Sequence, residues 1–146
     1  MSGAGDATLL AQRSAEAMWA LDTATRSLGM QIDRIEPGVA VLSMTVAESM
    51  VNGHGTCHGG YIFMLADSAF AFACNSFNQK NVAQNCQITF VTPGRLGKRL
   101  VAEARMRQRA ERSGIYDVTV RSDTGETIAE FRGHSRAISG THVLEC

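Results

Sequence analysis

Residues 61–75 read YIFMLADSAFAFACN, and Asp67 is the one charged side chain among them. On a helix, the apolar residues of this segment would cover every side. A helix that is apolar all round is a buried helix. We therefore expect residues 61–75 to form a long helix at the centre of the fold, with a single acid on it.

Downstream of Lys80 the apolar residues recur with a period of two, which indicates half-buried strands. The alternation covers residues 86–91, 100–106, 116–120 and 127–131. Pro93-Gly94 and Asp123-Thr124-Gly125 supply turns. The second half of the chain therefore predicts four strands joined by short connections.

Upstream of the central helix, the sequence predicts a helical segment and a strand. Residues 6–28 follow a helical period that Gly29 ends, and residues 38–46 form an apolar run typical of a buried strand. Residues 1–5 are expected to be disordered. This order predicts one α+β domain over residues 1–146, with an antiparallel sheet wrapped around the central helix.

The composition is that of an ordinary globular protein, with 45% hydrophobic and 19% charged residues. The formal net charge is zero, so bulk electrostatics give no support to a nucleic-acid partner. Residues 1–79 carry three Lys/Arg and seven Asp/Glu, a net −4, whereas residues 80–146 carry eleven and seven, a net +4. A phosphate-bearing ligand should therefore meet its cations in the second half, unless these residues only form a solvated basic face.

The sequence shows no signal peptide and no apolar run of about 18 residues, so we expect neither export nor membrane insertion. The four cysteines should then be reduced thiols: Cys57, Cys74, Cys86 and Cys146. We expect a cytoplasmic protein.

Asp67 is the first candidate for chemistry. Burying an isolated carboxylate costs roughly several kcal/mol unless the group is paired or lines a cavity. Desolvation raises the pKa of such an acid and makes it a stronger base. The alternative is a structural Asp satisfied by backbone amides or by a distant Arg.

Gly59 and Gly60 open the central helix. The first amides of a helix point outward with a partial positive charge, and glycine lets a ligand approach them closely. Asp67 lies two turns beyond Gly60, on roughly the same side of the helix. A carboxylate and an oxyanion donor together would suit acyl transfer, although a glycine pair can also form a tight strand-to-helix turn.

These residues are part of a longer pattern that resembles the PaaI-type hotdog thioesterases from about Leu28 to Gly140. The matching motifs are Asn52-Gly53, His58-Gly59-Gly60, Leu65-Ala66-Asp67, Ala69, Asn75, Pro93-Gly94, Gly114-Ile115-Tyr116-Asp117 and Phe131-Arg132-Gly133. The resemblance implies a hotdog fold and hydrolysis of acyl-CoA thioesters. Members from the phenylacetate pathway act on hydroxylated phenylacetyl-CoA, which becomes the expected substrate. We expect no cofactor and no metal.

The resemblance also implies roles for single residues. Asp67 would be the general base or nucleophile, and the Gly59 amide would bind the oxyanion. Asn52 would place the carbonyl or water, and His58 would hold the loop at the helix start. Family members carry a hydroxyl residue near the start of the next strand, but residues 82–85 read VAQN here.

The family further implies a homo-oligomer. Two subunits join their sheets edge to edge, and each site takes its Asp from one chain and its Gly and Asn from the other. Dimers commonly pair into tetramers.

For the CoA phosphates we expect cations from the turn at residues 95–99, Arg95 above all, and from Arg132 and Arg136. The acyl group should meet Gly60 and Phe63 on the helix. The aromatic and apolar residues nearby could complete this slot: Met50, Tyr61, Phe70 and Phe72. A ring hydroxyl should then meet an amide such as Asn75 or Gln84.

Other functions fit parts of the pattern. A metal site could use His54, Cys57, His58, Asp67 and Cys74, but their spacing is not a standard zinc pattern. A Cys57–His58 nucleophile pair is disfavoured because adjacent loop residues rarely reach one substrate atom. A hotdog hydratase or dehydratase would need a His paired with a carboxylate, and His58 and Asp67 could form that pair. A module that only binds acyl-CoA would not need Asp67.

Overall fold

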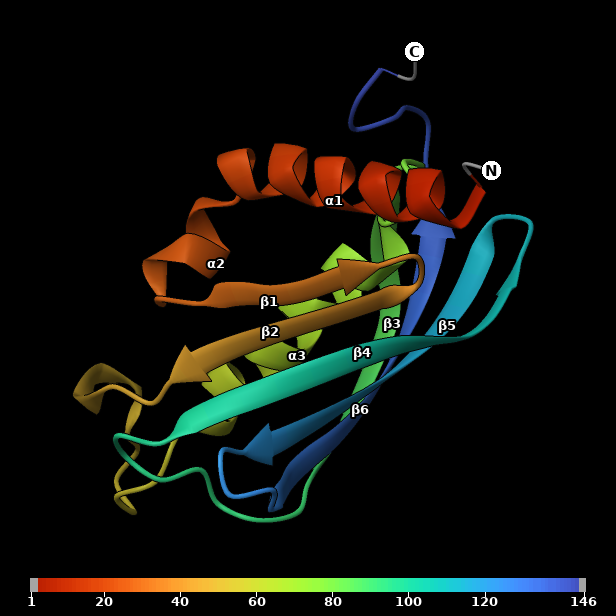
Figure 1. The fold of residues 1–146 in the computed structure, drawn as a ribbon. Helices are drawn as coiled ribbons and strands as arrows, with labels where there is room; N and C mark the ends of the chain where they lie inside the picture. The colour runs from red at the N-terminus through yellow and green to blue at the C-terminus, as the bar shows by residue number, and fades with distance from the viewer. Residues whose placement is uncertain (1–2, 145–146) are drawn as a thin grey trace.

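The computed structural model describes residues 3–144 (Figure 1). Its elements, in chain order, are α1 (Gly3–Leu21), α2 (Thr23–Ser27), β1 (Gln31–Glu36), β2 (Val39–Thr45), the 3-10 helix η1 (Glu48–Met50), α3 (Gly59–Cys74), β3 (Asn81–Phe90), β4 (Arg99–Ala110), β5 (Ser113–Ser122) and β6 (Thr127–Ala137). No helix within the described part of the chain is long and apolar enough to cross a membrane.

The six strands form one antiparallel sheet in the order β1-β2-β4-β5-β6-β3. The sheet curves around α3, and α1 runs along β1 at one edge (Figure 1). Side chains that alternate along β4 and β5, such as Leu100, Ala102 and Val118, are fully buried against α3. The expected α+β architecture, a sheet wrapped around a long central helix, is confirmed.

Within one chain, α3 is not buried on all sides as the sequence predicted. Leu65 and Ala69 are fully buried. Phe63, Asp67 and Ala71, spaced four residues apart, are only half-buried. We call these three residues the open stripe of α3. The stripe is open because the sheet ends at β3, the strand beside it.

The exposed edge of β3 is the second notable feature of the sheet. β3 pairs with β6 on one side and has no partner strand among residues 3–144 on the other. It is ten residues long, and Val82 and Phe90 are 46% and 51% exposed. Long edge strands with exposed apolar residues are surfaces where another chain can pair.

The sequence prediction missed β1. This strand is mostly exposed, and only Ile35 among its six residues is buried, so it lacks the alternation that identifies a half-buried strand. Antiparallel pairing with β2 instead fixes its position in the sheet. The turn between the two strands contains Gly38, which adopts a φ of +73°.

The N-terminal helical segment also differs from the prediction. It is two helices, because Asp22 breaks the first and caps the second by accepting hydrogen bonds from the Thr25 amide and hydroxyl at 2.9 and 2.7 Å. Gly29 ends the segment as predicted, with a φ of +69°. Disorder was predicted for residues 1–5, but Gly3–Gly5 are helical, and Asp6 in the first turn complements the helix dipole; residues 1 and 2 lie outside the described residues.

Candidate active site

The start of α3 presents one backbone amide without an internal partner. His58 is the N-cap, and its Nδ1 atom accepts a hydrogen bond of 2.9 Å from the Gly60 amide. The Gly59 amide has no acceptor among the described residues. His58 therefore fixes the helix start while leaving the Gly59 N–H available to a ligand, with the positive end of the helix dipole behind it.

The loop ahead of α3 is organised by Asn52. Its Oδ1 atom accepts hydrogen bonds from the His54 amide at 2.9 Å and from the Thr56 amide and hydroxyl at 3.2 and 3.3 Å. A β-bridge between Thr56 and Arg95 brings Arg95 beside this loop. The structure thus gathers Asn52, His58, Gly59 and Arg95 at one end of α3.

Phe90, at the end of β3, covers the first residue of α3. A Cβ atom on Gly59 would lie 2.9 Å from the Phe90 ring, closer than carbon atoms pack, so a larger residue would require the ring or the helix start to shift. Beside this contact is an open hollow of about 490 Å³, which Gly59, Ile62, Cys57 and Phe90 help to line. Phe90 therefore forms one wall of the space in front of the Gly59 amide.

Asp67 lies on the open stripe of α3, opposite Cys86 of β3. The Cys86 thiol donates a hydrogen bond to Oδ1 of Asp67 over 3.9 Å. Burial raises the pKa of Asp67 above its usual value, and the Cys86 hydrogen bond lowers it by a smaller amount. Burial, together with the charge of Asp67, raises the pKa of Cys86 to about 11, so this thiol stays protonated and acts as a donor at neutral pH.

Sequence reasoning missed Cys86 as a site residue. The alternation placed it in a strand, with Ile88 and Phe90 on the same side. Nothing in that pattern showed which residue of the strand would face Asp67, because this depends on the register between β3 and α3.

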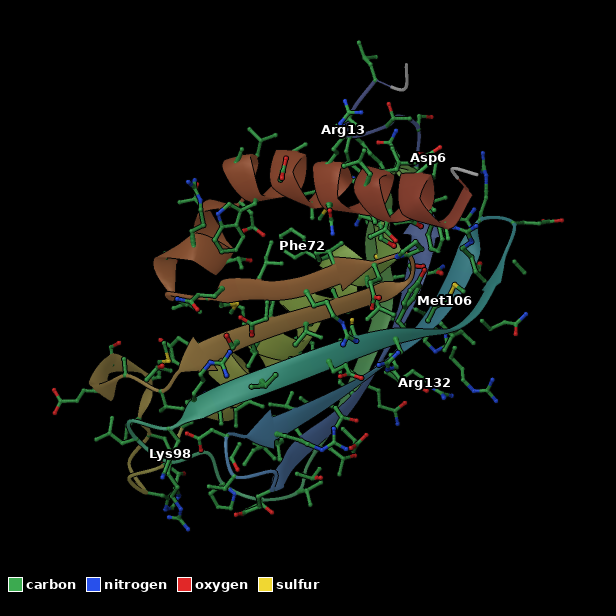
Figure 2. All side chains as sticks on the ribbon, in the orientation of Figure 1. Asp6, Arg13, Phe72, Lys98, Met106 and Arg132 are labelled. Carbon is green, nitrogen blue, oxygen red and sulfur yellow. The ribbon has the colours of Figure 1, made fainter. Side chains whose placement is uncertain are left out.

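Arg132 and Arg136 are not brought together with Asp67. Their neighbours on β6, Phe131 and Ser135, are buried on the inner side of the sheet, so the two arginines point to the opposite side. Figure 2 shows Arg132 on this outer side. There it makes two hydrogen bonds to Asp117, of 2.7 and 2.9 Å. Within one chain, the two arginines therefore lie on the face of the sheet turned away from Asp67, and their role as phosphate ligands stays a prediction.

The Asn75 side chain is used in hydrogen bonds within the chain. It is 3% exposed and follows the last residue of α3. Its Nδ2 atom donates to the carbonyl oxygens of Ala71 and Asn81, at 2.8 and 3.2 Å. Its Oδ1 atom accepts from the Asn81 amide at 2.8 Å and contacts His142 Nε2 at 2.7 Å. No polar atom of Asn75 remains for a ring hydroxyl.

The other expected contacts divide between core and surface. Phe70 and Phe72 are 1% exposed and belong to the core. Phe63 lies on the open stripe, with its ring centroid 5.5 Å from that of Phe131. Gln84 is exposed on β3. Of the three phenylalanines on α3, Phe63 is therefore the one that shares the open stripe with Asp67.

The separation between Asp67 and Gly59 decides how a site could be built. Eight helical residues correspond to a rise of about 12 Å. One thioester carbonyl must lie about 3 Å from both an oxyanion donor and a nucleophile or its base. The two groups of one chain are too far apart to act on the same carbonyl.

Residues 3–144 contain no cluster of three or more His, Cys, Asp or Glu that could hold a metal ion. His54, Cys57, His58, Asp67 and Cys74, which could have formed one, are not gathered in the fold.

Comparison with known proteins identifies the family. The family model of the thioesterase superfamily matches residues 54–129. Acyl-coenzyme A thioesterase PaaI of Escherichia coli (strain K12) is 44% identical over 131 residues, which are 90% of this chain and 94% of that protein. The E. coli PaaI structure has a TM-score of 0.90 at 42% identity and covers 92% of this chain and 97% of its own. A mutant of the phenylacetic acid degradation protein PaaI from Thermus thermophilus has a TM-score of 0.77 at 34% identity, with 80% of this chain and 100% of its own covered. The resemblance seen in the sequence is thus confirmed, and the chain belongs to the thioesterase superfamily as a PaaI-type enzyme with the hotdog fold.

Proposed function

We propose that the protein hydrolyses acyl-CoA thioesters to a free acid and CoA, with Asp67 as general base or nucleophile. The observation that carries this proposal is the position of Asp67, a half-buried carboxylate of raised pKa on the open stripe of α3. The relation to an acyl-coenzyme A thioesterase supports the substrate class.

In the general-base form of the reaction, Asp67 takes a proton from water as the water oxygen attacks the thioester carbonyl carbon. The carbonyl oxygen becomes an oxyanion that accepts a hydrogen bond from the Gly59 amide. When the tetrahedral intermediate collapses, the C–S bond breaks and CoA leaves as a thiolate, which takes up a proton. Cys86 donates to Oδ1 of Asp67, and we propose that Oδ2 takes the proton from the reacting water.

We further propose that each site is shared by two chains. The rise of about 12 Å between Gly59 and Asp67 rules out joint action within one chain. Pairing of two exposed β3 edges would set two antiparallel α3 helices side by side, so that Asp67 of one chain could meet the helix start of the other. A dimer built in this way could pair further into a tetramer.

A complementation experiment tests the shared site. Asp67→Asn removes the base, whereas Asn52→Asp keeps the loop hydrogen bonds to Oδ1 but removes the Nδ2 donor. When the two inactive variants are unfolded together and refolded, half of the dimers should contain one intact site, giving about a quarter of wild-type activity. No recovery in the mixture, despite folded mixed dimers, would contradict the shared site.

For the acyl group we propose hydroxylated phenylacetyl-CoA, and for a CoA phosphate the Arg95 side chain beside the Asn52 loop. Support comes from the PaaI relatives and from Phe63 on the open stripe. Specificity constants, followed by release of the CoA thiol, should favour ring-hydroxylated phenylacetyl-CoA over medium straight-chain acyl-CoAs by roughly ten-fold or more. Equal or faster hydrolysis of the straight chains would exclude the aromatic assignment and leave thioester hydrolysis intact.

Cys57, Cys74 and Cys86 are free thiols. This supports a reducing compartment, and we propose the cytoplasm as the place of action.

A further inference from the structure

A second cavity lies beyond the C-terminal end of α3. It opens between the hairpin that joins β4 to β5 and the end of β6, which lie side by side at the upper right of Figure 1. Its volume is about 460 Å³, and Phe77, Arg109, Glu111, Arg112, Tyr116 and Ser135 are among the residues that line it. None of these residues has a role in the proposed hydrolysis.

Two hydroxyl groups in this cavity have no partner. Tyr116 is 1% exposed and Ser135 is 2% exposed, yet neither hydroxyl forms a hydrogen bond with any described residue. Throughout residues 3–144, every fully enclosed side-chain nitrogen or oxygen atom does have a partner. The two oxygens must therefore reach open space, and the cavity that both residues line provides it.

Gly114 leaves room between these two residues. A Cβ atom on Gly114 would lie 2.6 Å from Oγ of Ser135 and 2.8 Å from the Tyr116 ring. Any larger residue would displace them, so the bare backbone of Gly114 allows Tyr116 and Ser135 to lie side by side.

Two cationic side chains, those of Arg109 and Arg112, line the cavity. The guanidinium carbon of Arg109 lies 3.6 Å from the centre of the Phe77 ring, a cation–π contact that orients the side chain. Neither Arg109 nor Arg112 forms a salt bridge within the described residues. Glu111 is the one carboxylate in the lining, so the fixed charge around the cavity sums to about +1.

The Tyr116 hydroxyl is a neutral donor. Burial and the charge of Cys74 raise its pKa to about 12, and the charge of Arg109 opposes these effects. Arg109 lines the same cavity as this hydroxyl and that of Ser135. A guanidinium and two hydroxyl donors thus face the same space.

We propose that this cavity binds a small oxyanion, a carboxylate or phosphate group, held by Arg109 and Arg112 and by the Tyr116 and Ser135 hydroxyls. The site is separate from Asp67, because neither Asp67 nor any other residue of the open stripe lines the cavity. The proposal does not depend on the proposed function.

Titration calorimetry at low ionic strength tests the site in the full-length protein, with inorganic phosphate, propionate and the uncharged isostere propionamide as probes. We expect saturable binding of phosphate or propionate and none of propionamide. If phosphate binds more tightly, the ligand is a phosphate ester; if propionate binds more tightly, it is a carboxylic acid. No saturable binding of either anion at about 50 mM, where a site with a Kd near 1 mM would be filled, overturns the proposal.

Variants locate the binding. Arg109→Gln should weaken it by about ten-fold or more, as loss of a charged hydrogen bond does. Tyr116→Phe and Ser135→Ala should weaken it by roughly three-fold with an unchanged Tm, because neither hydroxyl has an internal partner to lose. The matched control is Arg107→Gln, an exposed arginine of β4 outside this lining. An equal loss in Arg107→Gln, or none in Arg109→Gln, would show that binding follows net charge or another site and would overturn the assignment.

Discussion

The Cys86 thiol lies 3.9 Å from Oδ1 of Asp67 and joins the edge strand β3 to the open stripe of α3. This contact opposes the effect of burial on the acid. Burial favours the neutral form of Asp67, whereas a donated hydrogen bond favours the charged form.

Replacing Cys86 should therefore shift the pH dependence of the reaction. Cys86→Ala removes the donor, so the pKa of Asp67 should rise further and activity should be lost at a higher pH on the acid side. Cys86→Ser keeps a donor and serves as the control. The measurement is the acid limb of kcat/KM against pH for the three proteins. Identical acid limbs in wild type and Cys86→Ala would contradict the role of the thiol.

Gly59→Ala should impair catalysis through the Phe90 ring. The added Cβ meets this ring at 2.9 Å and must displace it or the helix start. We expect kcat to fall by about ten-fold or more as the oxyanion donor moves. The control is Gly53→Ala in the preceding loop, where no heavy atom lies within 4 Å of the new Cβ. Adding Phe90→Leu to Gly59→Ala should restore part of the activity. If Gly59→Ala keeps the kcat of wild type, and Phe90→Leu changes nothing in that background, the oxyanion donor lies elsewhere.

His58 should stabilise the fold through its cap. His58→Ala leaves the Gly60 amide without the Nδ1 acceptor and should lower the free energy of unfolding by about 1 kcal/mol. His58→Asn supplies an oxygen acceptor at the same N-cap and should retain most of the stability. Urea unfolding measures both, and equal stability of wild type and His58→Ala would exclude the capping role.

Asn75→Ala distinguishes a structural amide from a substrate contact. Its hydrogen bonds at the end of α3 are buried, so we expect a loss of about 1–3 kcal/mol in the free energy of unfolding. Because Asn75 has no free polar atom, the KM of the folded variant should stay within about two-fold of wild type. Gln108→Ala, at an exposed amide, is the stability control. A large rise in KM with unchanged stability would return Asn75 to the substrate site.

The sequence predicts the central helix and the strands of the second half because burial imposes clear periods there. Tyr116, Val118 and Val120, which alternate along a predicted strand, are all at most 1% exposed. β1 has no such signal, since five of its six residues are not buried. Its place in the sheet comes from pairing with β2, a long-range relationship that local patterns do not record.

For the candidate site, the sequence identifies chemistry better than geometry. The isolated charge of Asp67 and the glycines at the helix start are visible as exceptions to a local pattern. The roles of Arg132, Asn75 and Cys86 depend on which face of a strand or which helix end they occupy. The net charge of each half of the chain could not show that Arg132 lies on the outer face of the sheet, where it donates hydrogen bonds to Asp117.

Turnover of Asp67→Asn tests the central claim most directly. The substitution keeps the shape of the side chain and removes the base or nucleophile, so steady-state hydrolysis of the preferred acyl-CoA should fall by about two to four orders of magnitude. Asp117→Asn, at an acid on the outer face, is the matched control and should stay within about two-fold of wild type. A folded Asp67→Asn enzyme that keeps more than about a tenth of wild-type turnover would contradict the assignment of Asp67.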